Sequence, residues 1–251
     1  MRNTTTDRLP IVALDFDRAG PAYALAERLR GSAEIFKVGS QLFTAEGPKV
    51  VEKIADLGFD IFLDLKFHDI PNTVAGAVAA AAELPRVKML TLHTTGGLAM
   101  MRAARDAVDG KEKRPALLGV TILTSMDAQA MEGVGLAGTP GSRALSLAKL
   151  AKEAGLDGVV ASAHEVAAIR EACGPEFLIV VPGIRPASAA VNDQSRVATP
   201  GDAIRAGASY LVVGRPITGA PDPAKAAASI AAEISAAAEN FTDAIRAKDG
   251  R

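Results

Sequence analysis

Short apolar segments alternate with longer segments of helical composition along most of the chain. The apolar segments are rich in Val, Ile, Leu and Phe, which is typical of buried strands. The segments between them are rich in Ala, Leu and Glu, which favour helices. The predicted strands are Ile11–Phe16, Ile35–Gly39, Ile61–Phe67, Met89–His93, Leu117–Leu123, Gly158–Ala161, Leu178–Pro182 and Leu211–Gly214. Examples of predicted helices are Tyr23–Leu29, Val50–Leu57, Val74–Glu83, Ser142–Ala154 and Ala163–Ala172.

Strands that alternate with helices predict an α/β protein with a parallel sheet. In a chain of 251 residues, eight such units favour a closed (β/α)8 barrel, or TIM barrel, as a single domain over residues 1–251. The alternative is an open doubly wound sheet, but no Gly-x-Gly-x-x-Gly turn follows the first predicted strand. A short polar segment at residues 1–9 precedes the barrel, and a helix at about residues 223–248 closes it.

Composition and charge narrow the function. Hydrophobic residues make up 49% of the chain and charged residues 23%, with a formal net charge of −1, which favours neither nucleic-acid nor membrane binding. The single cysteine, Cys173, excludes an intramolecular disulfide and a multi-cysteine zinc site, and fits a reducing compartment. No apolar run approaches the roughly 20 residues of a membrane helix. These features predict a soluble, cytoplasmic protein.

The segment Asp60–Thr73 carries the strongest candidate chemistry. Its apolar run is followed by Asp64, Lys66 and Asp69, and strand alternation places Asp64 and Lys66 on the same face. Buried charges require partners, so this pattern predicts an ammonium held between two carboxylates. The alternative is a solvated salt-bridge run at the end of a strand.

Polar residues at most of the other predicted strand ends favour a site over a solvated run. The carboxyl ends of barrel strands form the active-site face of this fold. The residues concerned are Asp15, Lys37, Asp64, Lys66, Asp69, His93, Thr124, Ser125, Arg185 and Arg215.

The last two strand ends suit an anion. Gly214 and Arg215 offer a main-chain N–H and a guanidinium where barrels often bind phosphate. The loop from Arg185 to about residue 200, which contains Gln194, has the length of a binding loop. For Arg215 the alternative is a surface salt bridge. His93 has no second histidine at ligand spacing, so no metal site is assigned, and Cys173 receives no role.

These motifs resemble the orotidine 5′-phosphate decarboxylase family of the bacterial type. The resemblance spans nearly the whole chain, and the block Asp64–Thr73 is its most specific part. At residues 93–97 the chain departs mildly from the family pattern, without affecting a catalytic group. The matching segments are Val12–Asp15, Lys37–Gly39, Asp64–Thr73, Val120–Ser125, Val181–Pro186, Asp193–Pro200 and Val213–Thr218.

The resemblance implies conversion of orotidine 5′-monophosphate to UMP and CO2 in de novo pyrimidine synthesis, without metal or organic cofactor. Lys66 would protonate C6 of the pyrimidine and Asp64 would face the departing carboxylate, with Lys37 and Asp69 completing the array. The enzyme would be a homodimer with shared active sites, in which Asp69 and Thr73 come from the second subunit. The implied substrate-binding residues are Asp15, Lys37, Asp64, Ile70, Asn72, Thr73, Thr124 (or Ser125), Arg185, Gln194, Gly214 and Arg215.

Two other functions compete with this expectation. One is a Mg²⁺-dependent phosphosugar decarboxylase or aldolase on the same barrel, which shares the Asp-x-Lys-x-x-Asp motif; Lys37 argues against it, because those relatives would carry an acidic residue there. The other is an inactive barrel that binds a nucleotide or a protein. The retained charges argue against that, because burying them is costly and gives little structural benefit.

Overall fold

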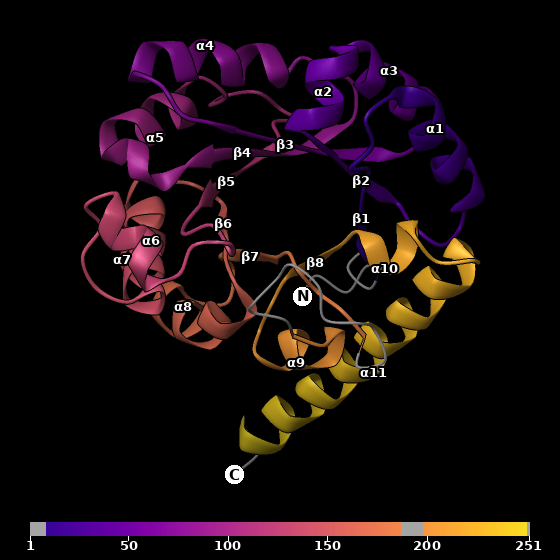
Figure 1. Cartoon of the computed structure of the whole chain (residues 1–251). Coiled ribbons are helices and arrows are strands. Elements are labelled where there is room, and N and C mark those ends of the chain that lie inside the picture. Colours follow the sequence, from indigo (N-terminus) through magenta and orange to yellow (C-terminus); the bar gives the residue numbers. More distant parts are fainter. Residues whose placement is uncertain (1–8, 187–197, 250–251) are drawn as a thin grey trace.

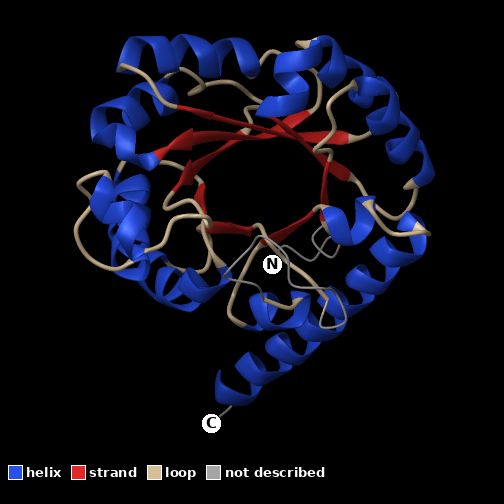
Figure 2. Cartoon of the chain, viewed as in Figure 1, coloured by secondary structure: helices blue, strands red, loops and turns tan. Residues whose placement is uncertain are grey.

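The computed structural model describes residues 9–186 and 198–249, with side chains as far as residue 239. Eight parallel strands form a closed barrel in the order of the sequence, with helices around its outside (Figures 1 and 2). This arrangement confirms the predicted (β/α)8 barrel. The strands are β1 (Ile11–Ala13), β2 (Ile35–Gly39), β3 (Asp60–Phe67), β4 (Val87–His93), β5 (Ala116–Val120), β6 (Gly158–Val160), β7 (Leu178–Val181) and β8 (Tyr210–Val213).

Helices follow the strands and form the outer layer of the barrel (Figure 1). The α-helices are α1 (Ala19–Arg28), α2 (Ser40–Glu46), α3 (Lys49–Asp56), α4 (Pro71–Ala81), α5 (Gly97–Asp106), α6 (Ala128–Gly133), α7 (Pro140–Glu153), α8 (Val166–Cys173), α9 (Pro200–Arg205), α10 (Arg215–Thr218) and α11 (Pro223–Asp249). Two 3₁₀ turns, η2 (Thr94–Gly96) and η3 (Ala163–Glu165), precede α5 and α8.

The strands alternate between two apolar environments. One set of side chains fills the barrel interior, and the other packs beneath the surrounding helices. The large outer cluster includes Leu63 and Leu90, both fully buried, together with the apolar faces of the helices. The inner cluster consists of Ile11, Ala13, Ile35, Phe62, Met89, Leu118, Val180 and Val212. This inner cluster forms an apolar floor, and the inward positions one pleat further along the strands lie above it.

Several strand and helix ends differ from the sequence-based expectation. The first strand was expected to reach Phe16 and the fifth to reach Leu123, but β1 ends at Ala13 and β5 at Val120. In both cases the chain leaves the ladder before the polar residues, so Asp15 and Thr124 lie in loops at the mouth of the barrel. The expected helix Tyr23–Leu29 begins earlier, at Ala19. The predicted strands are too long because the apolar residues continue beyond the strand ends into the loops that carry the site.

Close approach of β6 and β7 gives a test of the barrel packing. A Cβ added to Gly158 would lie 2.2 Å from the main-chain oxygen of Leu178, its neighbour in the ladder. Gly158→Ala should therefore lower the free energy of unfolding by about 1–3 kcal/mol, measured by urea denaturation. The control is Gly76→Ala on α4, where a Cβ meets nothing within 4 Å and helix propensity should add about 0.5–1 kcal/mol. Equal stability of the two variants would contradict this packing.

Candidate active site

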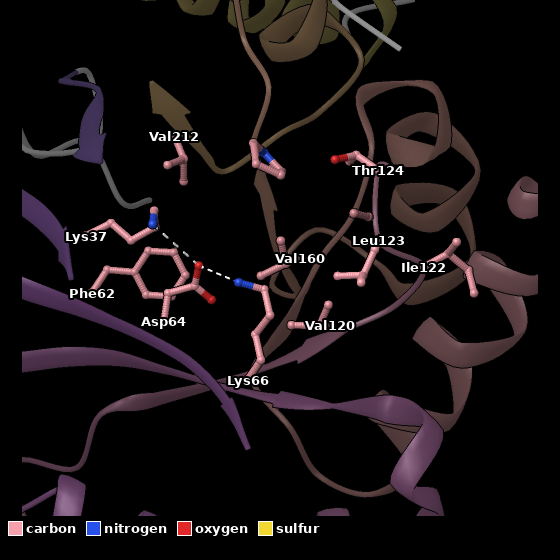
Figure 3. A pocket seen from close by; sticks show the side chains of 12 residues that line it. Lys37, Phe62, Asp64, Lys66, Val120, Ile122, Leu123, Thr124, Val160 and Val212 are labelled. Carbon is pink, nitrogen blue, oxygen red and sulfur yellow. Dashed lines mark hydrogen bonds and ion pairs between the residues drawn. The ribbon is translucent and has the colours of Figure 1, made fainter. Parts of the chain in front are cut away.

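Four charged side chains of alternating sign line up at the carboxyl ends of the first three strands. The Nζ of Lys37 lies 2.8 Å from Asp15 Oδ1 and 3.7 Å from Asp64 Oδ2. The Nζ of Lys66 lies 2.7 Å from the same Asp64 oxygen. In Figure 3 the Asp64 carboxylate lies between the two ammonium groups. We call Asp15, Lys37, Asp64 and Lys66 the charged array.

Strand register brings the array together. Lys37 follows Ile35 by one pleat on β2, and Asp64 follows Phe62 by one pleat on β3, so both point inward above the apolar floor. β2 and β3 pair Lys37 with Phe62, which sets the two charged residues at adjacent levels. Gly39 keeps this space open, because a Cβ there would lie 3.0 Å from Lys37 Nζ. The array is therefore a direct consequence of the parallel ladder.

Asp64 is the most deeply buried member of the array, with 8% of its surface exposed. Burial alone would raise the pKa of its carboxyl group. The charges of Lys37 and Lys66, together with hydrogen bonds from Lys66 and Thr91, outweigh burial and bring that pKa below its ordinary value. Asp64 is thus held as a carboxylate inside the barrel mouth.

The end of β3 is irregular where it carries the array. β3 pairs Leu63 with Leu90 of β4 and then Phe67 with Leu92, so β3 carries extra residues opposite Thr91. Within this bulge Lys66 has a φ of 53°, in the left-handed region that a side chain disfavours. Bulges of this kind redirect side chains near active sites. The bulge places the Lys66 ammonium beside Asp64 although the ladder is interrupted.

A cavity of about 210 Å³ opens over the array. Lys37, Asp64 and Lys66 form its charged side, and Thr124 adds a hydroxyl (Figure 3). The remaining wall is apolar and comes mainly from β5 to β8. It consists of Phe62, Val120, Ile122, Leu123, Val160, Ala161, Pro182 and Val212. A ligand in this cavity would meet charged side chains on one side and apolar side chains on the other.

The structure brings together Asp15, Lys37, Asp64, Lys66 and Thr124 as expected. Within one chain the Asp64 carboxylate lies between two ammonium groups, and the predicted ammonium between two carboxylates, which requires Asp69 of a second chain, stays a prediction. Lys37 arrives from β2, while Asp69 lies beyond the strand end.

Asp69 and its neighbours do not line this cavity. The Asp69 carboxylate is exposed and accepts a hydrogen bond from the Ile70 main-chain N–H at 2.6 Å. Ile70, Asn72 and Thr73 are exposed as well, around the start of α4, and none of them lines the cavity. Their part in a site therefore stays a prediction that requires a second chain.

The predicted phosphate residues have different surroundings. Gly214 lies beside the array, since a Cβ there would be 3.9 Å from Asp15 Oδ2, and Arg215 follows as an exposed residue at the start of α10. Arg185 is buried and does not line the cavity, while its main-chain N–H donates to Ala198. Gln194 lies outside the described residues. Ser125 is exposed and, unlike Thr124, is not part of the wall.

The residues set aside on sequence grounds lie off the array. His93 lines a second, largely apolar cavity of about 280 Å³, and its ring lies 5.3 Å from that of His68. Burial, assisted by the charges of His68 and Lys66, lowers the pKa of His93. Cys173 is buried, and burial raises the pKa of its thiol. Among the described residues, neither His93 nor Cys173 forms a hydrogen bond or ion pair with the charged array, although His93 is close enough for the charges of Lys66 and Asp64 to affect its pKa.

Sequence reasoning missed the apolar wall and one polar residue. Val160, Ala161 and Val212 carry no signal of their own in the sequence, because they resemble the apolar residues of any buried strand. Sequence reasoning also missed Thr91, a fully buried residue of β4 whose hydroxyl contacts Asp64. Its position could have indicated it. Thr91 lies one pleat beyond Met89 of the apolar floor, so its side chain also points into the barrel.

Two features of the described part of the chain bear on other functions. No group of three or more His, Cys, Asp or Glu side chains there is arranged to hold a metal ion. Within the same residues, no helix is long and apolar enough to cross a membrane. The acidic groups nearest the cavity, Asp15 and Asp64, are instead bound to lysines.

The fold and the site define a (β/α)8-barrel enzyme with a lysine–carboxylate array facing an apolar cavity. The chain belongs to the orotidine 5′-phosphate decarboxylase / HUMPS family, whose family model matches residues 8–230.

Relatives and solved structures agree with this assignment. The chain is 54% identical over 225 residues to the orotidine 5′-phosphate decarboxylase of Nitrosococcus oceani, covering 90% of this chain and 97% of the relative. It is 56% identical over 227 residues to that of Halorhodospira halophila, covering 90% and 96%. The crystal structure of orotidine 5′-phosphate decarboxylase from Lactobacillus acidophilus superposes with a TM-score of 0.79 at 39% identity, covering 90% and 99%.

The low pKa of Asp64 predicts how stability depends on pH. A carboxyl group whose pKa is lower in the folded state stabilises the fold above its unfolded value of about 4, and this contribution is lost as the pH falls through the folded pKa. Asp64→Asn removes the contribution. The unfolding free energy of the wild type should therefore fall more steeply than that of the variant below about pH 4, measured by urea denaturation. Parallel curves would contradict the lowered pKa.

Proposed function

We propose that this protein is an orotidine 5′-phosphate decarboxylase, a carboxy-lyase that converts orotidine 5′-monophosphate to UMP and CO2. The observation that carries the proposal is the Lys66 ammonium, 2.7 Å from the buried Asp64 carboxylate and facing an apolar cavity. Membership of the family and the names of relatives at 54% and 56% identity support the same reaction.

Lys66 is the proton donor in the proposed reaction. The bond between C6 of the pyrimidine and the carboxyl carbon breaks, CO2 leaves, and the electron pair stays at C6. The ammonium of Lys66 stabilises this developing negative charge and then transfers a proton to C6. Val120, Val160 and Ala161 give the cavity an apolar wall, and exclusion of water by this wall and the bound substrate would favour Lys66 over solvent as the source of the proton.

Asp64 and Lys37 have supporting roles in the proposal. Asp64 faces the substrate carboxylate, so their repulsion is relieved as neutral CO2 departs. Its second task is to hold Lys66, which it contacts through Oδ2. Lys37 partly neutralises Asp64 from the other side and bridges to Asp15. Without Lys37, Asp64 would lose one of the two cations that offset its burial.

The remaining predicted residues bind the two ends of the nucleotide. Asp15, exposed at the mouth of the barrel, holds the ribose hydroxyls, and Thr124 contacts the base. The phosphate lies near Gly214 and Arg215 at the end of β8, with Arg185 and Gln194 assigned to the same end by the family resemblance. Binding energy from the phosphate, far from C6, can order the charged array. The proposed chemistry needs no cofactor.

The proposal includes a homodimer in which each site is shared. Ile70 has 66% of its surface exposed, and Leu123 and Val134 are the other large hydrophobic residues exposed among those described. Leu123 lines the cavity and Ile70 immediately follows Asp69, so an apolar contact between two copies would bring Asp69 towards the neighbouring site. Asp69, Ile70, Asn72 and Thr73 of one subunit would then serve the other, in a cytoplasmic enzyme.

The test of the reaction follows the loss of orotidine 5′-monophosphate absorbance. The wild type should turn over without added metal and in the presence of EDTA. Lys66→Ala should lower kcat by at least about 10²–10⁴-fold, the range for loss of a general acid. The matched control is Lys88→Ala, because Lys88 is an exposed lysine on β4, and its kcat should stay within about twofold of wild type.

Two results would overturn this proposal. One is turnover by the wild type only when Mg²⁺ is supplied, as expected for a Mg²⁺-dependent phosphosugar decarboxylase of the same barrel. The other is undiminished turnover by Lys66→Ala.

Subunit complementation tests the shared site. Lys66→Ala and Asp69→Ala homodimers should each be nearly inactive, because every site lacks one group. After mixing, unfolding and refolding together, half of the dimers are mixed and each has one intact site, so about a quarter of wild-type activity should return. If each subunit built its own site, mixing would restore nothing.

A further inference from the structure

The hydroxyl of Thr91 joins the two catalytic residues of β3 from the neighbouring strand. We propose that Thr91 is a positioning residue for the decarboxylation, fixing both the Asp64 carboxylate and the Lys66 backbone. This inference rests on the proposed function, and it adds a residue from β4 to an array drawn from β2, β3 and the loop after β1. Thr91 is fully buried and has no exposed surface.

The hydrogen bonds of Thr91 have a defined direction. Its Oγ1 donates to Asp64 Oδ1 at 2.9 Å, since an ionised carboxylate can only accept. The same Oγ1 accepts from the Lys66 main-chain N–H, also at 2.9 Å. The hydroxyl therefore uses its one proton on the carboxylate and a lone pair on the lysine backbone. Reversing either bond would leave a donor facing a donor or an acceptor facing an acceptor.

Thr91 fixes the rotation of the Asp64 carboxylate. A carboxylate turns easily about its terminal bond, because that torsion has only broad minima. Here Oδ1 is held by Thr91, while Oδ2 is directed to Lys66 at 2.7 Å and towards Lys37 at 3.7 Å. Without the hydroxyl, Oδ1 would lack a partner in a site with little access for water. The carboxylate could then rotate and draw Lys66 out of position.

Thr91 also replaces ladder contacts that the β3 bulge removes. It is the β4 residue opposite the bulge, between the Leu63–Leu90 and Phe67–Leu92 pairs. The Lys66 N–H points to the Thr91 side chain at the residue with φ of 53°. A left-handed conformation costs a residue with a Cβ free energy, so it persists only when surrounding contacts hold it. The Thr91 hydroxyl is such a contact.

The Thr91→Val variant removes the hydroxyl and keeps the shape of the side chain. Loss of a hydrogen bond to a charged group should lower kcat by about 10–100-fold. KM should change by less than about threefold, because Thr91 is not among the residues that line the cavity. Thr91→Ser keeps the hydroxyl and should stay within about threefold of the wild-type kcat.

A second readout follows the carboxyl group itself. In Thr91→Val the pKa of Asp64 should move up, because a hydrogen bond to the ionised form is lost. NMR titration of the Asp64 carboxyl carbon measures this shift, with the signal assigned by its absence in Asp64→Asn. The acid limb of the plot of kcat against pH should move to higher pH by a similar amount.

The matched control is Thr94→Val. Thr94 is another fully buried threonine, whose hydroxyl donates only to the main-chain oxygen of Val120 at 2.8 Å. Its loss should affect thermal stability and leave the Asp64 titration unchanged.

The outcomes separate this inference from the proposed reaction. Wild-type kcat and an unshifted Asp64 titration in Thr91→Val would overturn the positioning role, and so would equal losses in Thr91→Ser and Thr91→Val. An Asp64 shift as large in Thr94→Val as in Thr91→Val would also overturn it. If the wild type failed to decarboxylate orotidine 5′-monophosphate, the proposed function would fall. The NMR titration would still decide whether Thr91 holds Asp64.

Discussion

The site depends on keeping one carboxylate ionised inside the barrel. Removing the Asp64 charge from water costs several kcal/mol, and it is tolerated only when cations and donors surround the group. Lys37 supplies a charge from β2, Lys66 supplies another from within the β3 bulge, and Thr91 supplies a hydroxyl from β4. Each partner is thus needed by the others, because removing one leaves a buried group uncompensated.

The barrel is well suited to meeting this requirement. Parallel strands in fixed register place successive inward side chains at set heights, so residues of separate strands meet without any loop having to fold first. Phe62 and Met89 close the interior below, which makes the level of Asp64 and Thr91 the first at which polar groups can lie near solvent. The bulge in β3 then places the Lys66 side chain beside Asp64, which a regular strand could not do. A continuous ladder would have placed the Lys66 side chain a full pleat beyond Asp64 along the strand.

Much of this was predictable from sequence, and the reasons are specific. The barrel follows from the repeated apolar segments, because buried parallel strands have few alternative environments. Asp64, Lys66, Lys37 and Asp15 stand out because charge at the end of an apolar segment is unusual. The place of Lys37 in the array was predicted only through the family resemblance, because residue spacing alone does not say that Lys37 approaches Asp64 from β2. Thr91 gave no signal of its own, since threonine is common in strands.

The array of one chain is also electrostatically open at one end, which bears on how an anionic substrate could be accepted. Asp15, Lys37 and Asp64 each contact an opposite charge within the array. The array ends at Lys66, which contacts Asp64 on one side only. The Lys66 side chain keeps 33% of its surface exposed. In the proposed reaction, such an end would attract the substrate carboxylate. An Asp69 supplied by a second subunit would turn the neutral array negative and oppose that carboxylate. Phosphate binding far from C6 would then have to offset the repulsion, and the repulsion itself would disappear as CO2 leaves. The requirement for an ionised Asp64 therefore links the barrel register to the proposed dimer and the proposed phosphate site.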